Sequence, residues 1–198
     1  NRATSPDQAF SDSLNATIYG HNPRVKPLEL SDLPKVNYDR ILRMAAERTA
    51  NANGWRFVIV GNYDEANIRQ LITRYLGSLP SKGPNPNSKQ AVFFKKGVSV
   101  NDFVRKMETP KANANMAWFS EDIPYTTENA IKASIAGQIL SMVYIKKIRE
   151  DASAAYSCGA QGSASIEDKY HNVMLFAYCP MKPEKADVAL QIMRDEVV

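Results

Sequence analysis

Histidine and cysteine are scarce in this chain of 198 residues, which contains two of each. Cys158 and Cys179 are too few to form a cysteine-type metal site on their own. Neither His21 nor His171 has a second histidine at the spacing of a His-x-x-Glu-His helix, so that metal-binding motif is excluded too. We therefore expect no cofactor-binding or metal-ligating residue in this sequence, and any metal chemistry must take its ligands from elsewhere.

Long apolar runs and a strong excess of one charge are also missing. No run of about 18 uncharged apolar residues occurs, so we expect no membrane-spanning segment. The 25 Lys and Arg residues outnumber the 21 Asp and Glu residues only slightly, and they are scattered along the chain. This distribution argues against a dedicated nucleic-acid-binding protein.

The sequence does have the composition of a globular domain, with 44% hydrophobic and 23% charged residues. At this length we expect one domain over residues 1–198 with a substantial core. The chain begins at Asn1 without a methionine and ends at Val198 inside a helical pattern. We therefore expect it to be a piece of a longer protein.

Hydrophobic periodicity predicts an alternation of helices and short strands. Helices are predicted over residues 5–18, with Ser5-Pro6 as the start, and over residues 37–50, 62–77, 127–148 and 185–198, with Asn37 and Asn62 as N-caps. Strands are predicted over residues 55–60, 98–109, 111–119, 154–163 and 172–179. Hairpins dominate the expected pairing, which predicts an α+β fold with a mainly antiparallel sheet and helices packed on one face.

The last two predicted strands form a hairpin around Glu167–Lys169. If the chain turns between Asp168 and Lys169, Cys158 lies opposite Cys179. A disulfide is then geometrically possible, and buried free thiols are the alternative that we favour.

Three further local features of the sequence need an interpretation. The run from Gly159 to Ser163 consists mainly of small residues, which suits either the close approach of a substrate backbone or packing under a helix. His21 lies among turn residues, and we expect it to be structural or exposed rather than a ligand. The pair Lys95-Lys96 is predicted to be a solvated face.

The most informative stretch joins the predicted helix 127–148 to the strand after it. The helix brings Arg149 to its last turn, and Tyr156 follows seven residues later among small residues. An arginine can fork onto a peptide carbonyl or a carboxylate, and a tyrosine hydroxyl can donate to a developing oxyanion. Spacing alone leaves a structural alternative open, because cations favour helix C-termini and tyrosine is common in strands.

Several segments in this order and spacing resemble the insulinase/pitrilysin family of zinc metallopeptidases. The likeness is to the domain type that follows a metal-binding-type domain and completes each half of those proteins. The segments that carry it are Tyr19–Arg24, Val36–Arg40, Phe57–Asn62, Leu71–Pro80, Ile148–Ser157 and Cys179–Lys185.

The resemblance implies a clamp of two homologous halves that encloses a peptide. Zinc would be bound by an inverted His-x-x-Glu-His helix in the N-terminal half, and the C-terminal half would add an arginine and a tyrosine seven residues apart. Arg149 would then hold the substrate backbone, and Tyr156 would hydrogen-bond the scissile carbonyl oxygen as it becomes a tetrahedral oxyanion. One departure from the family pattern is Ala155, where glycine is common.

The resemblance therefore predicts the last domain of a four-domain zinc metalloendopeptidase. Zinc would be bound by another domain, and this chain alone would be inactive. The partners would be a peptide or small protein substrate and the N-terminal half of the same protein, in a bacterial periplasm or secreted. The alternative function is a non-catalytic peptide-binding or assembly domain of an inactive family member, and an unrelated α+β binding domain remains a third possibility.

Overall fold

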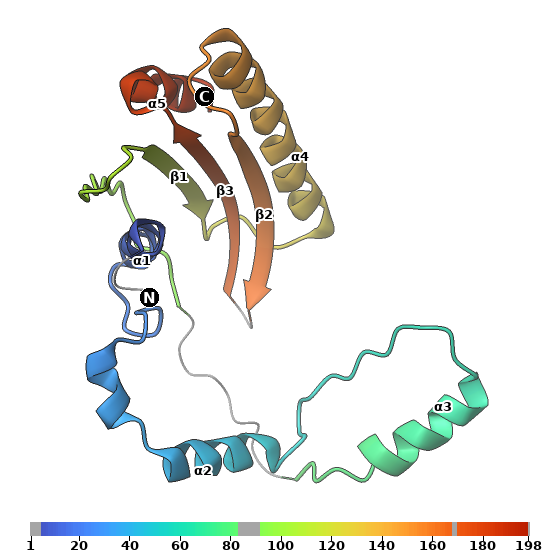
Figure 1. Cartoon of the computed structure of the whole chain (residues 1–198). Coiled ribbons are helices and arrows are strands. Elements are labelled where there is room, and N and C mark those ends of the chain that lie inside the picture. The colour runs from blue at the N-terminus through green and yellow to red at the C-terminus, as the bar shows by residue number, and fades with distance from the viewer. Residues whose placement is uncertain (1–4, 83–91, 168–169, 198) are drawn as a thin grey trace. The chain divides into compact units, whose positions relative to one another are not determined.

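A computed structural model describes residues 5–82, 92–167 and 170–197 (Figure 1). The chain divides into two compact units, one of Asn1–Pro27 with Ala91–Val198 and one of Leu28–Gln90. Whether the two units together form one domain, as the sequence predicts, stays a prediction. No helix in the described part of the chain is long and apolar enough to cross a membrane.

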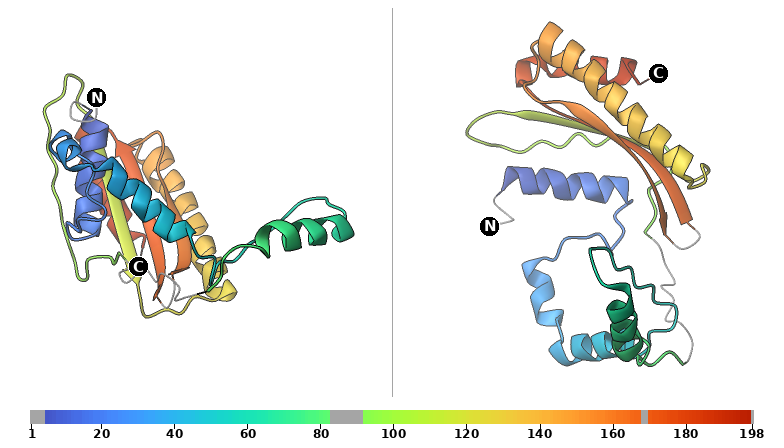
Figure 2. Two further views of the ribbon diagram at one scale, coloured as in Figure 1. Left: turned by 90° about the horizontal axis from the view of Figure 1, so that it is seen from below. Right: turned by 90° about the vertical axis from the view of Figure 1, so that its right-hand side faces the viewer.

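The first unit is built on a three-stranded antiparallel sheet. Its strands are β1 (Ala112–Ser120), β2 (Gly159–Glu167) and β3 (Tyr170–Met181), in the spatial order β1-β3-β2. Helices α4 (Thr127–Tyr144) and α5 (Ala186–Asp195) cover one face of this sheet (Figure 2). The predicted α+β class with helices on one face of an antiparallel sheet is therefore confirmed.

The register of the β2–β3 hairpin is the one predicted from the sequence. Gly159 pairs with Tyr178, and continuing this register by one step sets Cys158 opposite Cys179. Residues 168–169, where the turn was predicted, lie outside the described residues. Strand β2 begins five residues later than predicted, because the residues before it form the connection from α4.

The contact between α4 and β2 is a close approach of two backbones. A Cβ atom built on Gly162 would lie 1.7 Å from the carbonyl oxygen of Ala133, and one built on Gly137 would lie 2.2 Å from the amide nitrogen of Gly162. Ala160 and Ala177 are buried on neighbouring positions of the sheet. Of the two interpretations of the small-residue run, packing under a helix is therefore confirmed at Gly162.

The core lies between the sheet and the two helices. Tyr144 is fully buried, and its hydroxyl donates to the backbone carbonyl of Met193 over 2.7 Å. Burial raises the pKa of this phenol to about 12. The hydrogen bond joins the end of α4 to α5, and Ile148 and Cys179 fill the space beside it.

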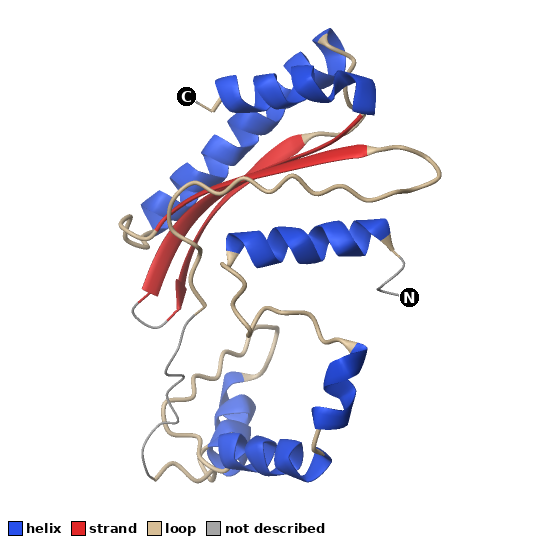
Figure 3. Ribbon diagram, turned by 90° about the vertical axis from the view of Figure 1, so that its left-hand side faces the viewer, coloured by secondary structure: helices blue, strands red, loops and turns tan. Residues whose placement is uncertain are grey.

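Helix α1 (Pro6–Ile18) packs against the extended residues 92–104 of the same unit (Figure 3). Ser5 caps the helix and Pro6 occupies its first position, as the sequence predicts. Phe10 meets Phe103 edge to face, with ring centroids 6.2 Å apart.

Of the two strands predicted between residues 98 and 119, only the second forms, as β1. The prediction of a strand over residues 98–109 is wrong. These residues are extended but form no ladder in the described structure, because side chains of α1 and the Gly97 turn (φ 82°) hold them instead.

The second unit contains α2 (Tyr38–Thr49), capped by Asn37 as predicted. It also contains α3 (Glu65–Leu71), which a π-helical turn extends to Leu76. The cap of α3 is Asp64, so the prediction of Asn62 is wrong by two residues. The carboxylate of Asp64 accepts the hydrogen bond from the backbone amide of Asn67, because it lies two residues closer to the first turn than the side chain of Asn62.

Residues 55–60, predicted as a buried strand, are neither buried nor a strand. Val58 is 75% exposed and Val60 is 90% exposed. A strand needs a neighbour for its backbone groups, and the described part of this unit has no second strand to pair with it. The prediction of a buried strand is therefore wrong both in burial and in strand pairing.

Candidate functional site

The connection from α4 to β2 is fixed to the core by backbone hydrogen bonds. Helix α4 continues as a π-helical turn over Ile145–Asp151. Beyond it, the amide of Ala154 donates to the carbonyl of Ile148 over 2.9 Å, and the carbonyl of Ala154 accepts from Lys182 over 3.0 Å. Ser153 adopts a left-handed conformation with φ of 48°, which turns the chain sharply before these bonds form.

Two buried alanines precede an exposed tyrosine in this connection. Ala154 is fully buried and Ala155 is 7% exposed, whereas Tyr156 is 84% exposed. The methyl group of Ala155 packs in the core, so a small side chain suits the position where the family commonly has glycine. The anchored alanines therefore present the phenol of Tyr156 to solvent from a fixed backbone.

The structure brings together the two residues that the sequence singled out. The guanidinium carbon of Arg149 lies 5.1 Å from the centroid of the Tyr156 ring, which is a cation–π arrangement. Such a contact contributes about 0.5–1 kcal/mol at an exposed site. It orients both side chains without using the hydroxyl of the tyrosine or the N–H groups at the edge of the guanidinium.

The acidic residues that follow Arg149 are engaged by another cation. Lys146 Nζ lies 3.5 Å from Glu150 Oε2 and 2.9 Å from Asp151 Oδ1. Its hydrogen bond to Asp151 raises the pKa of Lys146. Within the described ranges, no carboxylate forms an ion pair with Arg149, so its donors are available to a ligand.

The two cysteines lie beneath this surface but are not suited to nucleophilic chemistry. Both are buried and carry free thiols, as one of the two sequence alternatives predicts. Burial raises the pKa of Cys179 to about 12. Burial also raises the pKa of Cys158, although the nearby charge of Arg149 partly opposes the shift. Both thiols are therefore protonated near neutral pH, and neither is a nucleophile.

The described residues do not supply a metal site. Across residues 5–82, 92–167 and 170–197, no three His, Cys, Asp or Glu side chains come close enough together to hold a metal ion. Catalytic zinc requires about three protein ligands, so this set of side chains does not fit zinc. What the Arg149–Tyr156 pair offers is a set of hydrogen-bond donors beside a positive charge.

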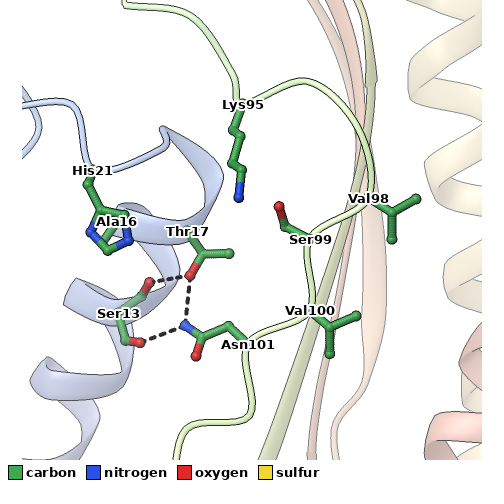
Figure 4. Close-up of a pocket in the computed structure, with 9 residues that line it drawn as sticks. All are labelled: Ser13, Ala16, Thr17, His21, Lys95, Val98, Ser99, Val100 and Asn101. Atoms are coloured by element: carbon green, nitrogen blue, oxygen red, sulfur yellow. Dashed lines mark hydrogen bonds between the residues drawn. The ribbon is translucent and has the colours of Figure 1, made fainter.

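A second feature of the same unit is a polar hollow of about 610 Å³ between α1 and residues 95–101 (Figure 4). It is lined by Ser13, Ala16, Thr17, His21, Lys95, Val98, Ser99, Val100 and Asn101. This hollow was not predicted from the sequence, because its two walls are far apart in the chain. Lys95 was predicted to lie on a solvated face, and His21 was predicted to be structural or exposed. A glycine with positive φ lies beside each wall of the hollow, Gly20 after α1 and Gly97 within residues 95–101.

Comparison with protein families and known proteins places the chain among the peptidases. The family described as the Peptidase M16 inactive domain matches residues 37–198, which include Arg149 and Tyr156. The probable zinc protease PqqL of Escherichia coli strain K12 is 26% identical over 196 residues, covering 98% of this chain and 20% of that protein. The chain thus spans one fifth of the length of this relative.

Two solved structures share the fold over nearly the whole chain. The periplasmic protease PqqL from Escherichia coli matches with a TM-score of 0.67 at 25% identity, covering 97% of this chain and 21% of that one. The ferredoxin protease FusC in complex with Arabidopsis ferredoxin matches with a TM-score of 0.66 at 17% identity, covering 98% and 21%, a likeness of fold alone. Together with the family match, these findings confirm the resemblance to zinc metallopeptidases: the chain belongs to the M16 peptidase family, in the domain type described as inactive.

Proposed function

We propose that this chain is the substrate-contacting domain of a zinc-dependent endopeptidase. The observation that carries the proposal is the Arg149–Tyr156 pair, which is exposed, stacked at 5.1 Å and not engaged by any described carboxylate. The pair also lies where the helix leads into β2, with the seven-residue spacing that the resemblance to the family implies. Here the neighbouring acids are bound to Lys146, and the ring projects outward.

The two side chains would act on different parts of a peptide. The guanidinium of Arg149 can donate two N–H groups to one backbone carbonyl oxygen of the substrate. The hydroxyl of Tyr156 donates to the scissile carbonyl oxygen and holds it more tightly once it carries negative charge, so it stabilises the transition state more than the ground state. Zinc, bound by another part of the protein, would supply the activated water and polarise the same carbonyl.

The larger assembly is part of the proposal. We expect this chain to be the last of four domains and to face the N-terminal half of its own protein, which fits the 20% of PqqL that it covers. A peptide or small protein is the proposed substrate, supported by the FusC structure that contains ferredoxin. A periplasmic location is supported by the description of PqqL as periplasmic.

The test uses the full-length protein and cleavage of a quenched fluorescent peptide, with and without a chelator. We expect chelator-sensitive activity that Tyr156→Phe and Arg149→Ala each lower by roughly 10²-fold or more, as the loss of one oxyanion donor does. The chain offers a matched control in Arg74 and Tyr75, a second exposed cation–π pair with a separation of 5.4 Å. Tyr75→Phe and Arg74→Ala should leave cleavage unchanged.

The purified chain of 198 residues should not cleave the peptide even with added zinc, because its described residues do not fit the metal. Zinc-dependent cleavage by the chain alone would contradict this part of the proposal.

A second candidate is a non-catalytic peptide-binding or assembly domain. The description of the matching family as an inactive domain favours it. The same assay separates the two candidates. A full-length protein that cleaves nothing, or that cleaves equally well after both Arg149 and Tyr156 are changed, supports the non-catalytic function.

A further inference from the structure

The hollow between α1 and residues 95–101 has the chemistry of an anion site. We propose that it binds the carboxylate of a peptide, with Lys95 as the charged contact and Ser99 as a hydrogen-bond donor. The inference goes beyond the catalytic pair and rests on the proposed function only in taking a peptide as the ligand.

The polar groups of the hollow converge from both of its walls. Lys95 and Ser99 extend from one wall toward the side chains of α1, while Val98 and Val100 point to the other side of the segment (Figure 4). A Cβ atom built on Gly20 would touch the Lys95 stem at 3.5 Å, so this lysine is packed along the chain turn that follows α1. The stem of Lys95 therefore lies beside Gly20, and its ammonium group points into the space between the two walls (Figure 4).

Hydrogen bonds already connect the two walls of the hollow. Asn101 Nδ2 donates to Ser13 Oγ over 2.8 Å and to Thr17 Oγ1 over 2.7 Å. Thr17 Oγ1 in turn donates to the carbonyl of Ser13 over 2.9 Å. The amide of Lys95 donates to the carbonyl of Ile18 over 2.7 Å. These bonds tie the two walls together, so little ordering remains to be done when a ligand binds.

Lys95 supplies the positive charge of the hollow. None of the nine lining residues is acidic. Neighbouring lysines are paired, since Lys96 Nζ lies 3.2 Å from Glu121 Oε2 and Lys111 binds Asp7. Lys95 has no such carboxylate among the residues that the structure describes. A charged group that lines a polar concavity without a protein partner is suited to a ligand of opposite charge.

Size and charge together favour a peptide carboxylate over an inorganic anion. A volume of about 610 Å³ is far larger than one small ion and accommodates the last residues of an extended peptide. One ammonium and one hydroxyl match a single negative charge. Phosphate sites typically add arginine forks or a helix N-terminus, and the lining of this hollow has no arginine.

The experiment measures peptide binding directly, so its outcome is independent of turnover. The full-length protein is treated with a chelator to prevent cleavage, and a labelled hexapeptide without acidic side chains is titrated as its free acid and as its amide. A second amidated peptide with one glutamate, compared with its glutamine version, tests an acidic side chain as the source of the carboxylate. Inorganic phosphate is titrated as a competitor.

We expect the acid form, or the glutamate form, to bind about 10-fold more tightly than its uncharged counterpart, a difference of about 1.4 kcal/mol. Lys95→Gln should abolish this preference, and Ser99→Ala should reduce it. Lys96→Gln is the matched control and should keep the preference intact, because Lys96 belongs to the ion pair with Glu121.

Two results would overturn the inference. One is equal affinity for the charged and uncharged peptides, or a preference that survives Lys95→Gln. The other is that phosphate binds more tightly than either charged peptide and that this binding depends on Lys95. The hollow would then be a phosphate site. Failure of the Arg149–Tyr156 assignment would leave all of these binding results unchanged.

Discussion

Replacing Gly162 by alanine tests the contact that positions the candidate site. The added Cβ would lie 1.7 Å from the carbonyl oxygen of Ala133 and 2.5 Å from its carbonyl carbon. Both atoms belong to the backbone of α4, so no side chain can rotate to make room. The helix must move away from β2 by more than an ångström, or the strand must bend.

The expected loss of stability follows from this overpacking. Overpacking of a well-packed core costs about 1–3 kcal/mol, and a rigid backbone neighbour places Gly162→Ala at the upper end. For a protein of this size 1 kcal/mol shifts the melting temperature by roughly 2–4 °C, so we expect a fall of about 6–12 °C. Ser163→Ala, at the adjacent exposed position of β2, should change it by less than about 1 °C.

A double-mutant cycle sharpens the test. A Cβ on Gly137 would meet the amide of Gly162 at 2.2 Å, so Gly137→Ala pushes the same helix from the same strand. Once one alanine has moved α4, the second should cost less stability. The loss in the double mutant should therefore be smaller than the sum of the losses in the two single mutants. Calorimetric melting of the four proteins gives the coupling. Additive losses, or a melting temperature for Gly162→Ala equal to that of the original chain, would refute the backbone contact.

Three further predictions concern the buried core. Tyr144→Phe removes the donor to the carbonyl of Met193 and leaves that carbonyl without its partner, so we expect a loss of about 1–3 kcal/mol in urea unfolding; an unchanged midpoint would contradict this role. Burial raises the pKa of Cys179 from 9.0 to about 12. The folded state therefore retains a proton that the unfolded state loses, so this contribution to stability is complete below about pH 9 and is lost as pH rises toward 12. Urea midpoints across this pH range, compared with Cys179→Ala, should show a shallower decline in the variant. Native thiol labelling at pH 8 should be slow for both cysteines and complete on unfolding, and rapid native labelling would contradict the burial.

The features that the sequence predicted correctly are those that depend on neighbouring residues. Ser5 and Asn37 cap their helices because a short polar side chain precedes an apolar periodicity. The β2–β3 register follows from pairing residues that are equally far along the chain from the point between Asp168 and Lys169. The error at Asn62 is of the same kind, since Asp64 offers an equivalent oxygen two residues closer to the helix.

The two wrong strands depend on a distant partner. Residues 55–60 and 98–109 have the apolar, β-branched composition of strands, but the structure assigns neither segment to a strand. A strand exists only when another backbone lies beside it, and composition does not specify which one. The same limit explains why the hollow at Lys95 was not predicted.

For the candidate site, the sequence alone determined that an arginine ends a long apolar helix and that a tyrosine follows seven residues later, because both depend on spacing along the chain. The tertiary structure decided that the ring of Tyr156 is exposed and that the charge of Arg149 lies over it. It also brought α1 beside Lys95. The physical reason is that capping and periodicity act within one or two turns, whereas burial and charge pairing are set by residues that meet only when the chain is folded.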